Sequence, residues 1–472
     1  MRVLRPIPRL ERLEARDCPA VTVSLISGNL FLRGVPNSDL LLKATNDNQI
    51  KVQDGTSVLG IYNVPGNITL QLSNRPGAVN FDVNGKTING NVLFDLGNGY
   101  TGKLTSPDEA RSVNIYDGLA TTALGAGTIR GNVNIQAGNG NELVGVGFIQ
   151  ATTDLERPLT IRGNLTVIGR ASLTFAEDFQ LGEGSEVRGS VNVTHYDNVT
   201  LGSQVNPITS ITTVRGDVNI TTAGVGGGLF VNMYGNFLRN VTVNGAASTS
   251  ASNSFLLAPP ENTVDSVISG NLNVTFGSAL NGNLFTIAGS AGTAISQVVG
   301  TTTLTSNNGT LGIDDAKLNG LFGGLTTVSL GDGQNFLEVD AAAQFNANFV
   351  YNATNGNNNL KLQGVYFNQL NLNLGNGDNI INFIDAQVSN KINLKAGTGD
   401  NLVNFTNTSA TNYAIDFVFG QIPVGSGNNT VNLNSNITIL GGSQVIALTP
   451  MGTNVLNELG ANIIAPFTTN FL

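Results

Sequence analysis

Four arginines that each precede a glycine are the residues whose spacing most clearly suggests a binding site. Successive members lie 32, 26 and 27 residues apart, and each leads into a short apolar strand pattern; they are Arg130, Arg162, Arg188 and Arg215. In a repeating fold they would occupy one position of the repeat and form a column. Guanidinium groups pair with anionic oxygens, so the column could bind an anionic polysaccharide. The alternative is pairing at a turn with acids such as Glu186, Glu142 and Asp217.

Carboxylates that could cleave a glycan are the second candidate. Glycoside hydrolysis needs two carboxyl groups about 5–9.5 Å apart across the sugar. Asp314-Asp315, followed by Lys317, is an acidic pair in the repeat region. Neighbouring residues of a strand project to opposite faces, so this pair could act together only in a bend. We expect a surface turn there, and we expect the lone His195 to be a surface or strand-end residue, so no catalytic residue is predicted.

Three aspartates, Asp332, Asp378 and Asp400, lie in Gly-x-Gly turns and could ligate calcium. These turns resemble the calcium-binding nonapeptides of repeats-in-toxin proteins, which read Gly-Gly-x-Gly-x-Asp. The first glycine of that pattern is replaced by Leu330, Leu374 and Ala396. The key aspartate is replaced by Asn335, Asn379, Asn401 and Asn429, and the period is 22 residues in place of nine. Neutral amides are poorer calcium ligands than carboxylates, so we predict plain glycine–asparagine turns and no cofactor, with a weak calcium site as the alternative.

The elements that must position these residues are short strands that recur most clearly in residues 369–440. A strand at 370–374 enters the glycine turn 375–379 and continues as a strand at 380–383. The turn returns 22 and then 28 residues later. Within a strand the apolar residues alternate, as Val403 and Phe405 do around Asn404. Such a unit buries its apolar face only by stacking on copies of itself.

This pattern predicts an all-β fold, a right-handed parallel β-helix (β-solenoid) with coils of about 21–28 residues, although the pattern does not itself set the handedness. Gly-x-Gly groups that start at Gly97, Gly138, Gly182 and Gly224 are 41, 44 and 42 residues apart. We interpret those intervals as two coils each. Stacked coils should carry apolar residues inside, and asparagine and threonine outside.

Composition along the chain predicts four segments. Residues 1–20 form a basic leader, and residues 21–73 form a β-rich N-terminal cap, because their close strands and tight turns favour antiparallel pairs. Residues 74–454 carry the β-helix repeats. Residues 455–472 are a C-terminal cap or tail, since their apolar segments would cover an open coil edge.

The leader resembles the LEPR-XLL motif of exported planctomycete surface proteins. The matching residues are Leu10, Glu11, Leu13, Glu14, Arg16 and Ala20. Ala15 stands where that motif most often has proline, and Asp17-Cys18-Pro19 replaces its apolar pair. The resemblance covers about 11 residues. It implies export to the cell surface or the extracellular space, and it implies no chemistry.

Charge and composition narrow the function further. The chain carries a net charge of −9, with +2 in the leader and −11 in the remainder, which argues against nucleic acid as a partner. It has one Cys, one His and no Trp, and no apolar run reaches the roughly 18 residues of a membrane span. We therefore predict a non-enzymatic, exported cell-surface or extracellular protein with a structural or adhesive role. Its expected partners are extracellular polysaccharide or other surface proteins. The alternatives are a β-helix polysaccharide lyase or glycoside hydrolase, and a calcium-stabilised extracellular module.

Overall fold

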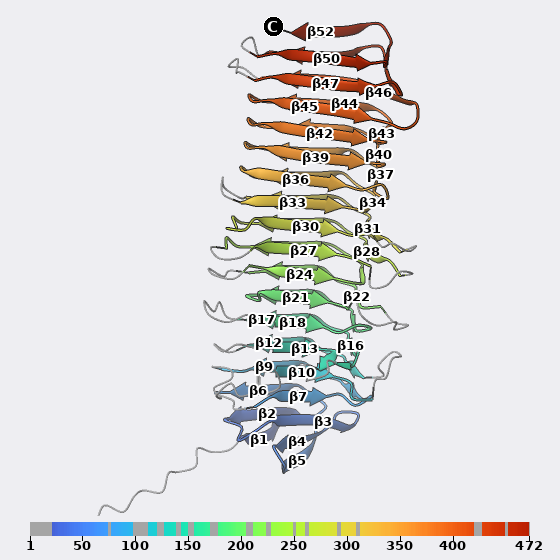
Figure 1. Cartoon of the computed structure of the whole chain (residues 1–472). Coiled ribbons are helices and arrows are strands. Elements are labelled where there is room, and N and C mark those ends of the chain that lie inside the picture. Colours follow the sequence, from blue (N-terminus) through green and yellow to red (C-terminus); the bar gives the residue numbers. More distant parts are fainter. Residues whose placement is uncertain are drawn as a thin grey trace, which may run out of the picture.

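The protein is a rod of stacked β-strand coils (Figure 1). The computed structural model describes residues 21–73, 77–97, 112–119, 127–137, 143–149, 155–169, 178–203, 211–222, 228–248, 252–259, 264–289, 294–307, 312–419, 427–448 and 452–471. All regular secondary structure in these ranges is β-strand. No helix in them is long and apolar enough to cross a bilayer. The leader, residues 1–20, lies outside the described residues.

The coils are built from three sheets, which we name sheets I, II and III, and sheet III extends from β8 (Thr87–Ile88) to β43 (Gln387–Val388). The strands of sheet I are β1 (Thr22–Ile26), β2 (Asn29–Gly34), β6 (Ile68–Leu72), β9 (Val92–Asp95), β12 (Val133–Gln136), β17 (Leu165–Ile168), β20 (Val191–Thr194), β23 (Val218–Thr221), β26 (Val241–Gly245), β29 (Leu272–Phe276), β32 (Thr302–Ser306), β35 (Thr326–Leu330), β38 (Phe349–Ala353), β41 (Leu370–Asn373), β44 (Lys391–Ala396), β46 (Thr411–Phe419), β48 (Ile437–Ile439), β49 (Ser443–Ala447), β51 (Asn462–Ile463) and β52 (Phe467–Phe471).

The strands of sheet II are β3 (Leu40–Asn46), β4 (Gln49–Asp54), β5 (Ser57–Asn63), β7 (Val79–Asp82), β10 (Ser112–Tyr116), β13 (Leu143–Val146), β18 (Asp178–Leu181), β21 (Asn198–Leu201), β24 (Phe230–Met233), β27 (Asn253–Leu257), β30 (Asn283–Ile287), β33 (Ile313–Leu318), β36 (Gln334–Val339), β39 (Asn358–Gln363), β42 (Asn379–Ile384), β45 (Asn401–Thr406), β47 (Asn429–Asn434) and β50 (Asn454–Leu459).

The strands of sheet III are β8 (Thr87–Ile88), β11 (Thr128–Ile129), β16 (Thr160–Ile161), β19 (Glu186–Val187), β22 (Thr213–Val214), β25 (Asn236–Phe237), β28 (Ser266–Ile268), β31 (Ser296–Val298), β34 (Gly320–Phe322), β37 (Gln344–Phe345), β40 (Tyr366–Phe367) and β43 (Gln387–Val388). A small antiparallel pair, β14 (Phe148–Ile149) and β15 (Leu155–Glu156), lies beside the stack.

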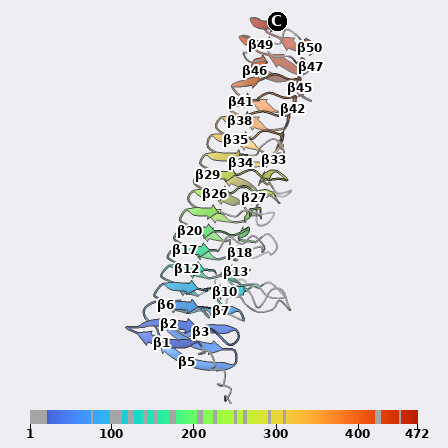
Figure 2. The ribbon, with the colours of Figure 1, turned by 90° about the vertical axis from the view of Figure 1, so that its left-hand side faces the viewer.

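Strands of neighbouring coils pair in parallel and in register, which confirms the predicted parallel β-helix. In sheet I, for example, Val133 faces Leu165 and Leu165 faces Val191. Seen from the side, the coils form a long, narrow stack (Figure 2). About 17 coils in the described part of sheet I, at about 4.8 Å each, give a length of roughly 80 Å.

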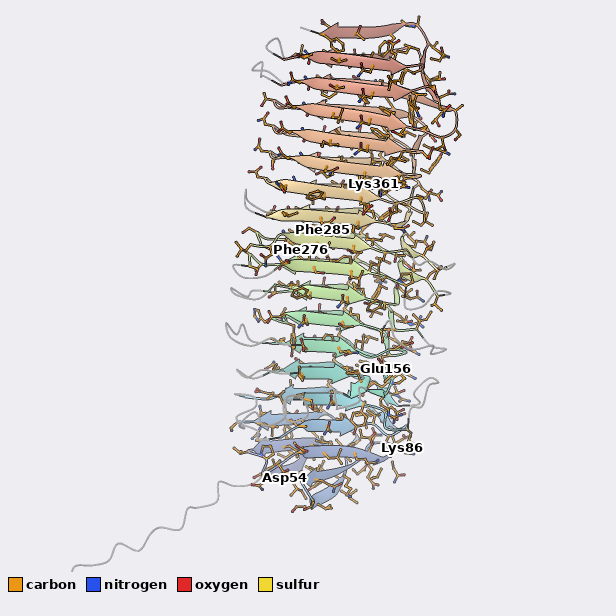
Figure 3. The ribbon with its side chains drawn as sticks, in the orientation of Figure 1. Asp54, Lys86, Glu156, Phe276, Phe285 and Lys361 are labelled. Atoms are coloured by element: carbon orange, nitrogen blue, oxygen red, sulfur yellow. The ribbon has the colours of Figure 1, made fainter. Side chains whose placement is uncertain are left out.

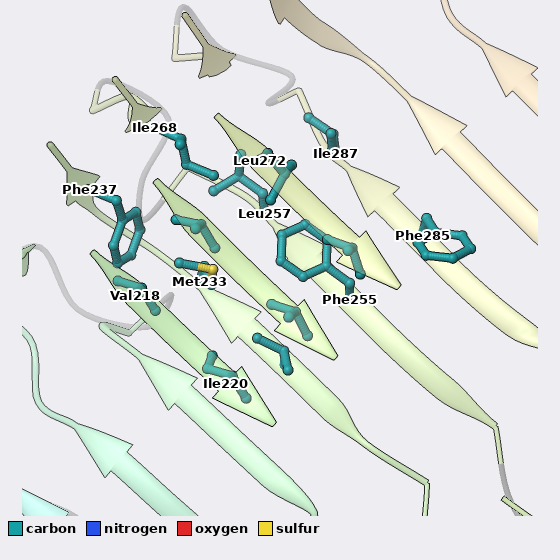
Figure 4. Close-up of a cluster of buried hydrophobic side chains, with 14 of the residues drawn as sticks. Val218, Ile220, Met233, Phe237, Phe255, Leu257, Ile268, Leu272, Phe285 and Ile287 are labelled. Atoms are coloured by element: carbon teal, nitrogen blue, oxygen red, sulfur yellow. The ribbon is translucent and has the colours of Figure 1, made fainter. Parts of the chain in front are cut away.

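Alternation of side chains builds the core, as the sequence predicts. In β45 the residues Val403 and Phe405 are buried while Asn404 is half-buried on the other face. Figure 4 shows buried residues of both sheets directed into the interior, among them Val218 from sheet I and Phe255 and Ile287 from sheet II. Rings on consecutive strands of one coil also stack: Phe276 in β29 and Phe285 in β30 lie 5.1 Å apart between centroids (Figure 3).

A glycine and an asparagine make the tight corner between sheets III and I. A Cβ on Gly131 would lie 2.4 Å from the carbonyl oxygen of Gly90 on the previous coil, so the close approach of the two backbones favours glycine at this corner. The next residue bonds coil to coil, because Asn132 N donates to Asn91 Oδ1 at 2.8 Å and Asn164 N donates to Asn132 Oδ1 at 2.8 Å. The recurring Arg-Gly-Asn segments are therefore corners.

Coil length varies more than the sequence indicates. Asn371 and Asn393, facing each other on neighbouring coils, are 22 residues apart, but Asn91 and Asn132 are 41 residues apart. Because β9 pairs directly with β12, that interval is one coil. The interpretation of the 41-residue interval as two coils is therefore wrong. The extra residues lie between strands and leave the register of the strands unchanged.

The ends of the stack differ from its middle. At the N-terminal end β1 pairs antiparallel with β2, and β4 pairs antiparallel with β3 and β5, as the close strands of residues 21–73 suggest. The β2 and β3 strands also pair in parallel with β6 and β7, so they begin the stack. Residues 455–472, where we expected a cap or tail, continue the parallel ladder through β50, β51 and β52.

Candidate ligand-binding face

The four Arg-Gly arginines lie on four consecutive coils in one column, which we call the arginine column. Each follows a strand of sheet III, and these strands are β11, β16, β19 and β22. The backbone N–H of each arginine donates to a carbonyl oxygen on the previous coil, that of the residue just before the column position. For example, Arg162 N donates to the oxygen of Ile129, which precedes Arg130, at 2.8 Å. Asn89 precedes the column and Leu238 follows it, since Arg130 N bonds to Ile88 O and Leu238 N bonds to Val214 O.

Two members of the column share one carboxylate. Arg188 Nε lies 3.2 Å from Glu186 Oε2, and Arg215 Nε lies 2.5 Å from Glu186 Oε1. Partial burial would raise the pKa of Glu186, but the hydrogen bonds from Arg215 and Arg188 outweigh burial and hold that pKa below its ordinary value. The arginines remain open to solvent, with 46% and 52% of their side chains exposed.

Pairing with Glu186 was one of the alternatives that the sequence left open, and it is present. The Asp217 carboxylate instead accepts from Asn240 N at 3.2 Å, and Glu142 lies outside the described residues. Arg130 and Arg162 are exposed and make no ion pair within the described ranges of the chain. Glu186 therefore holds half of the column, and among the described residues the other half has no ion-pair partner.

Threonine hydroxyls run beside the arginine column. Residues two positions before each arginine project to the same side of the strand. Those residues are Thr128, Thr160, Glu186 and Thr213. The outer surface of these coils therefore presents a cationic row and, parallel to it, a row of hydroxyl groups interrupted by one carboxylate.

Arg239 extends this surface and was missed in the sequence. On the coil after Arg215 the column position is Leu238, which is 42% exposed, and the exposed Arg239 follows it. Arg239 takes the corner position that glycine holds on other coils, since its backbone lies against Gly270. Arg239 is not followed by glycine, so the Arg-Gly pattern does not identify it. The pairing of β25 with β22 in sheet III shows that it lies beside the column.

Asp314 and Asp315 do not form a surface turn, so that expectation is wrong. Both lie in β33, and they face opposite sides of the strand as neighbouring strand residues must. Asp314 is fully buried, and its Oδ1 accepts from Asn283 N at 3.0 Å. Asp315 faces outward, 3.4 Å from Lys317 Nζ. The two carboxylates therefore do not converge on one site.

His195 is a strand-end residue, as expected. It follows β20 with a positive φ of 64° and is half-buried. Its Nδ1 lies 3.2 Å from Gly169 O, and its backbone N–H donates to Thr221 O at 2.9 Å. His195 therefore links its coil by hydrogen bonds to the coils on both sides.

The three turn aspartates do not converge: two of them accept from backbone N–H groups and the third accepts from a side-chain amide. Asp378 Oδ1 accepts from Asp400 N at 2.9 Å, and Asp400 Oδ1 accepts from Asn428 N at 2.7 Å. Asp332 lies in a different column, where Asn355 Nδ2 donates to it at 3.3 Å. No three His, Cys, Asp or Glu side chains group closely enough to hold a metal ion in the described ranges.

The asparagines at the toxin-repeat aspartate position face inward, contrary to the expectation of outward asparagines. A buried amide ladder joins them: Asn358 Nδ2 donates to Asn379 Oδ1 at 2.7 Å, Asn379 Nδ2 to Asn401 Oδ1 at 2.6 Å, and Asn401 Nδ2 to Asn429 Oδ1 at 2.7 Å. Asp314 occupies the same column, because it faces Asn335 and Asn335 faces Asn358. These residues serve the interior of the fold.

A depression of about 440 Å³ lies on the outer face of sheet II. Its lining includes Asp315, Lys317, Glu338 and Lys361. Lys361 Nζ donates to Glu338 Oε1 at 2.8 Å, which raises the pKa of Lys361 (Figure 3). The four charges of the lining therefore form two ion pairs, Lys361 with Glu338 across neighbouring coils and Lys317 with Asp315 within β33, as on an ordinary sheet surface.

A scan against protein-family models, a search of curated proteins and a search of solved structures each give no match to this chain. The protein is a parallel β-helix with one cationic column on its outer surface.

Proposed function

We propose that this protein is a non-enzymatic, exported β-helix that acts as a structural or adhesive rod at a cell surface or in the extracellular space. The observation that carries the proposal is the continuous stack of parallel coils from β2 to β52. Each coil pairs with its neighbours along sheets I and II, and from β8 to β43 also along sheet III, so the rod holds outward side chains at a fixed spacing. A rigid scaffold of this kind can hold surface components apart, and its regularly spaced side chains can make repeated contacts with a partner.

Bonding of the outward polar residues supports a structural role. Asn404 Nδ2 donates to Asn382 Oδ1 at 3.0 Å, Asn432 Nδ2 to Asn404 Oδ1 at 2.8 Å, and Asn457 Nδ2 to Asn432 Oδ1 at 2.7 Å. The residues considered for catalysis also have structural partners: Asp314 bonds to the backbone of Asn283, and His195 joins adjacent coils. Groups engaged in this way hold the stack together.

Export is supported by the leader, which resembles the LEPR-XLL motif at Leu10, Glu11, Leu13, Glu14, Arg16 and Ala20. The expected partners are extracellular polysaccharide or other surface proteins. An antibody raised against the purified chain should label intact cells of the source organism. Labelling that appears only after the cells are made permeable would overturn the proposed location.

A turnover assay separates this proposal from the polysaccharide-cleaving alternative. The purified chain is incubated with pectin, alginate, sulfated glycans and neutral glucans, with and without calcium, and we expect no product. Product formation that is lost in Asp315→Ala or Arg188→Ala would overturn the non-enzymatic proposal. Both side chains are exposed enough for these variants to fold.

A further inference from the structure

We propose that the arginine column binds a linear anionic polysaccharide that lies along the rod and crosses successive coils. The inference rests on the proposed surface function and names the partner of that surface. The column is Arg130, Arg162, Arg188 and Arg215, on coils that stack in register. Neighbouring strands are about 4.8 Å apart, so the guanidinium groups form a closely spaced row along the axis.

Within the part of the chain that the structure describes, the charge of the column is not balanced by nearby carboxylates. Like charges on facing positions of neighbouring strands repel each other. Four arginines meet one carboxylate, Glu186, which bonds Arg188 and Arg215 and leaves Arg130 and Arg162 without an ion pair in the described residues. The rest of the chain is acidic, with a net charge of −9 overall, so this row is a local exception. A bound polyanion would supply the missing counter-charge.

Side chains around the column suit a sugar chain. Guanidinium groups bind carboxylate and sulfate-like oxygens through two parallel N–H donors. The neighbouring row of Thr128, Thr160 and Thr213 offers hydroxyls that can donate to and accept from sugar hydroxyls. Glu186 pairs with Arg188 and Arg215, so an anionic ligand has to compete with this carboxylate for those two guanidinium groups.

Nucleic acid fits this face less well. Single strands are held by rings on which bases stack, and the rows beside the column consist of threonine and glutamate. The acidic body would also repel a phosphate backbone that extends beyond the column. A sugar chain with separated charges can follow the straight row without these contacts.

The test measures binding of the full chain to immobilised alginate and dextran sulfate, with neutral dextran, poly(dT) and duplex DNA as comparison ligands. Binding to the anionic glycans should fall with added salt, and neutral dextran should not bind. The double variant Arg130→Gln/Arg162→Gln should lose at least tenfold in affinity. The matched control Lys51→Gln/Lys395→Gln removes the same charge away from the column and should bind like the wild type. Glu186→Gln should bind more tightly, because the competing carboxylate is gone.

Several results would overturn the inference. Equal losses in the arginine variant and in the lysine control would show non-specific attraction. Tighter binding to poly(dT) or duplex DNA than to either glycan would replace the polysaccharide with nucleic acid. If neither anionic glycan binds, the proposed binding site is wrong. The proposed surface function would still be supported in that case if the antibody labels intact cells. Circular dichroism and melting curves that match the wild type establish that each variant is folded.

Discussion

Asn379→Ala should be one of the most damaging single substitutions of a polar residue in the rod. The side chain is fully buried, accepts from Asn358 Nδ2 at 2.7 Å, and donates to Asn401 Oδ1 at 2.6 Å and to Gly377 O at 2.9 Å. Alanine leaves an N–H of Asn358 and the Oδ1 of Asn401 without these partners in the interior. Each buried group that loses its hydrogen bond costs about 1–3 kcal/mol, so the total is roughly 2–6 kcal/mol.

The chain contains a matched control. Asn404 is the same residue type on the next coil, and it also makes two amide-ladder bonds, to Asn382 and Asn432. It is half-buried on the outer face, so water can replace the lost partners and Asn404→Ala should cost less than about 1 kcal/mol. A third variant, Asn379→Leu, keeps the number and branching of the side-chain heavy atoms but not the amide, and it should also destabilise. It separates loss of hydrogen bonds from loss of packing.

Hydrogen exchange of backbone amides in β39, β42 and β45 is the suitable assay, because damage in a solenoid can stay within neighbouring coils. A local loss of about 3 kcal/mol speeds exchange by roughly 100-fold. Asn379→Ala should reach that range, and Asn404→Ala should remain near the wild type. Equal effects of the two alanine substitutions, or wild-type exchange in Asn379→Leu, would refute the role assigned to the buried ladder.

Three further predictions concern the core, the dependence on pH and the leader. Phe405→Ala should cost roughly 3–5 kcal/mol locally, because Phe405 is buried and its ring stacks on Phe383 with centroids 4.5 Å apart; unchanged exchange in β45 would contradict this. Burial would raise the pKa of Asp416, but hydrogen bonds from Lys391 and Gln444 hold that pKa below its ordinary value. The ionised Asp416 therefore stabilises the fold at pH values above the ordinary pKa, and this contribution is lost as the pH falls through the lowered pKa. When the pH is lowered below about 4, the urea midpoint should therefore decrease less in Asp416→Asn than in the wild type. An equal decrease would exclude Asp416 as a source of the pH-dependent stability. A chain that begins at Val21 should melt at nearly the temperature of the full chain, since residues 1–20 lack the strand pattern; a large drop in melting temperature would show that the leader packs on the cap.

The sequence by itself determined the local features of this protein. The alternation in residues 401–406 assigned Val403 and Phe405 to the inside and Asn404 to the outside, and the structure agrees. The Arg-Gly spacing placed four arginines at one position of the repeat, and the register of sheet III confirms it. Close strands and tight turns in residues 21–73 indicated antiparallel pairing. These features follow from residues near each other in the chain, where strand period and turn chemistry act directly.

Only the tertiary structure decided which residues meet across coils. Glu186 is shared by Arg188, two residues away, and Arg215, 29 residues away. Asp314 is buried in a column with Asn335 and does not form a surface turn. Arg239 joins the cationic face although it lacks the Arg-Gly signature. The physical reason is that facing positions on neighbouring coils are separated by 22 residues in one place and by 41 in another, because the segments between strands vary in length while parallel pairing keeps the strands in register.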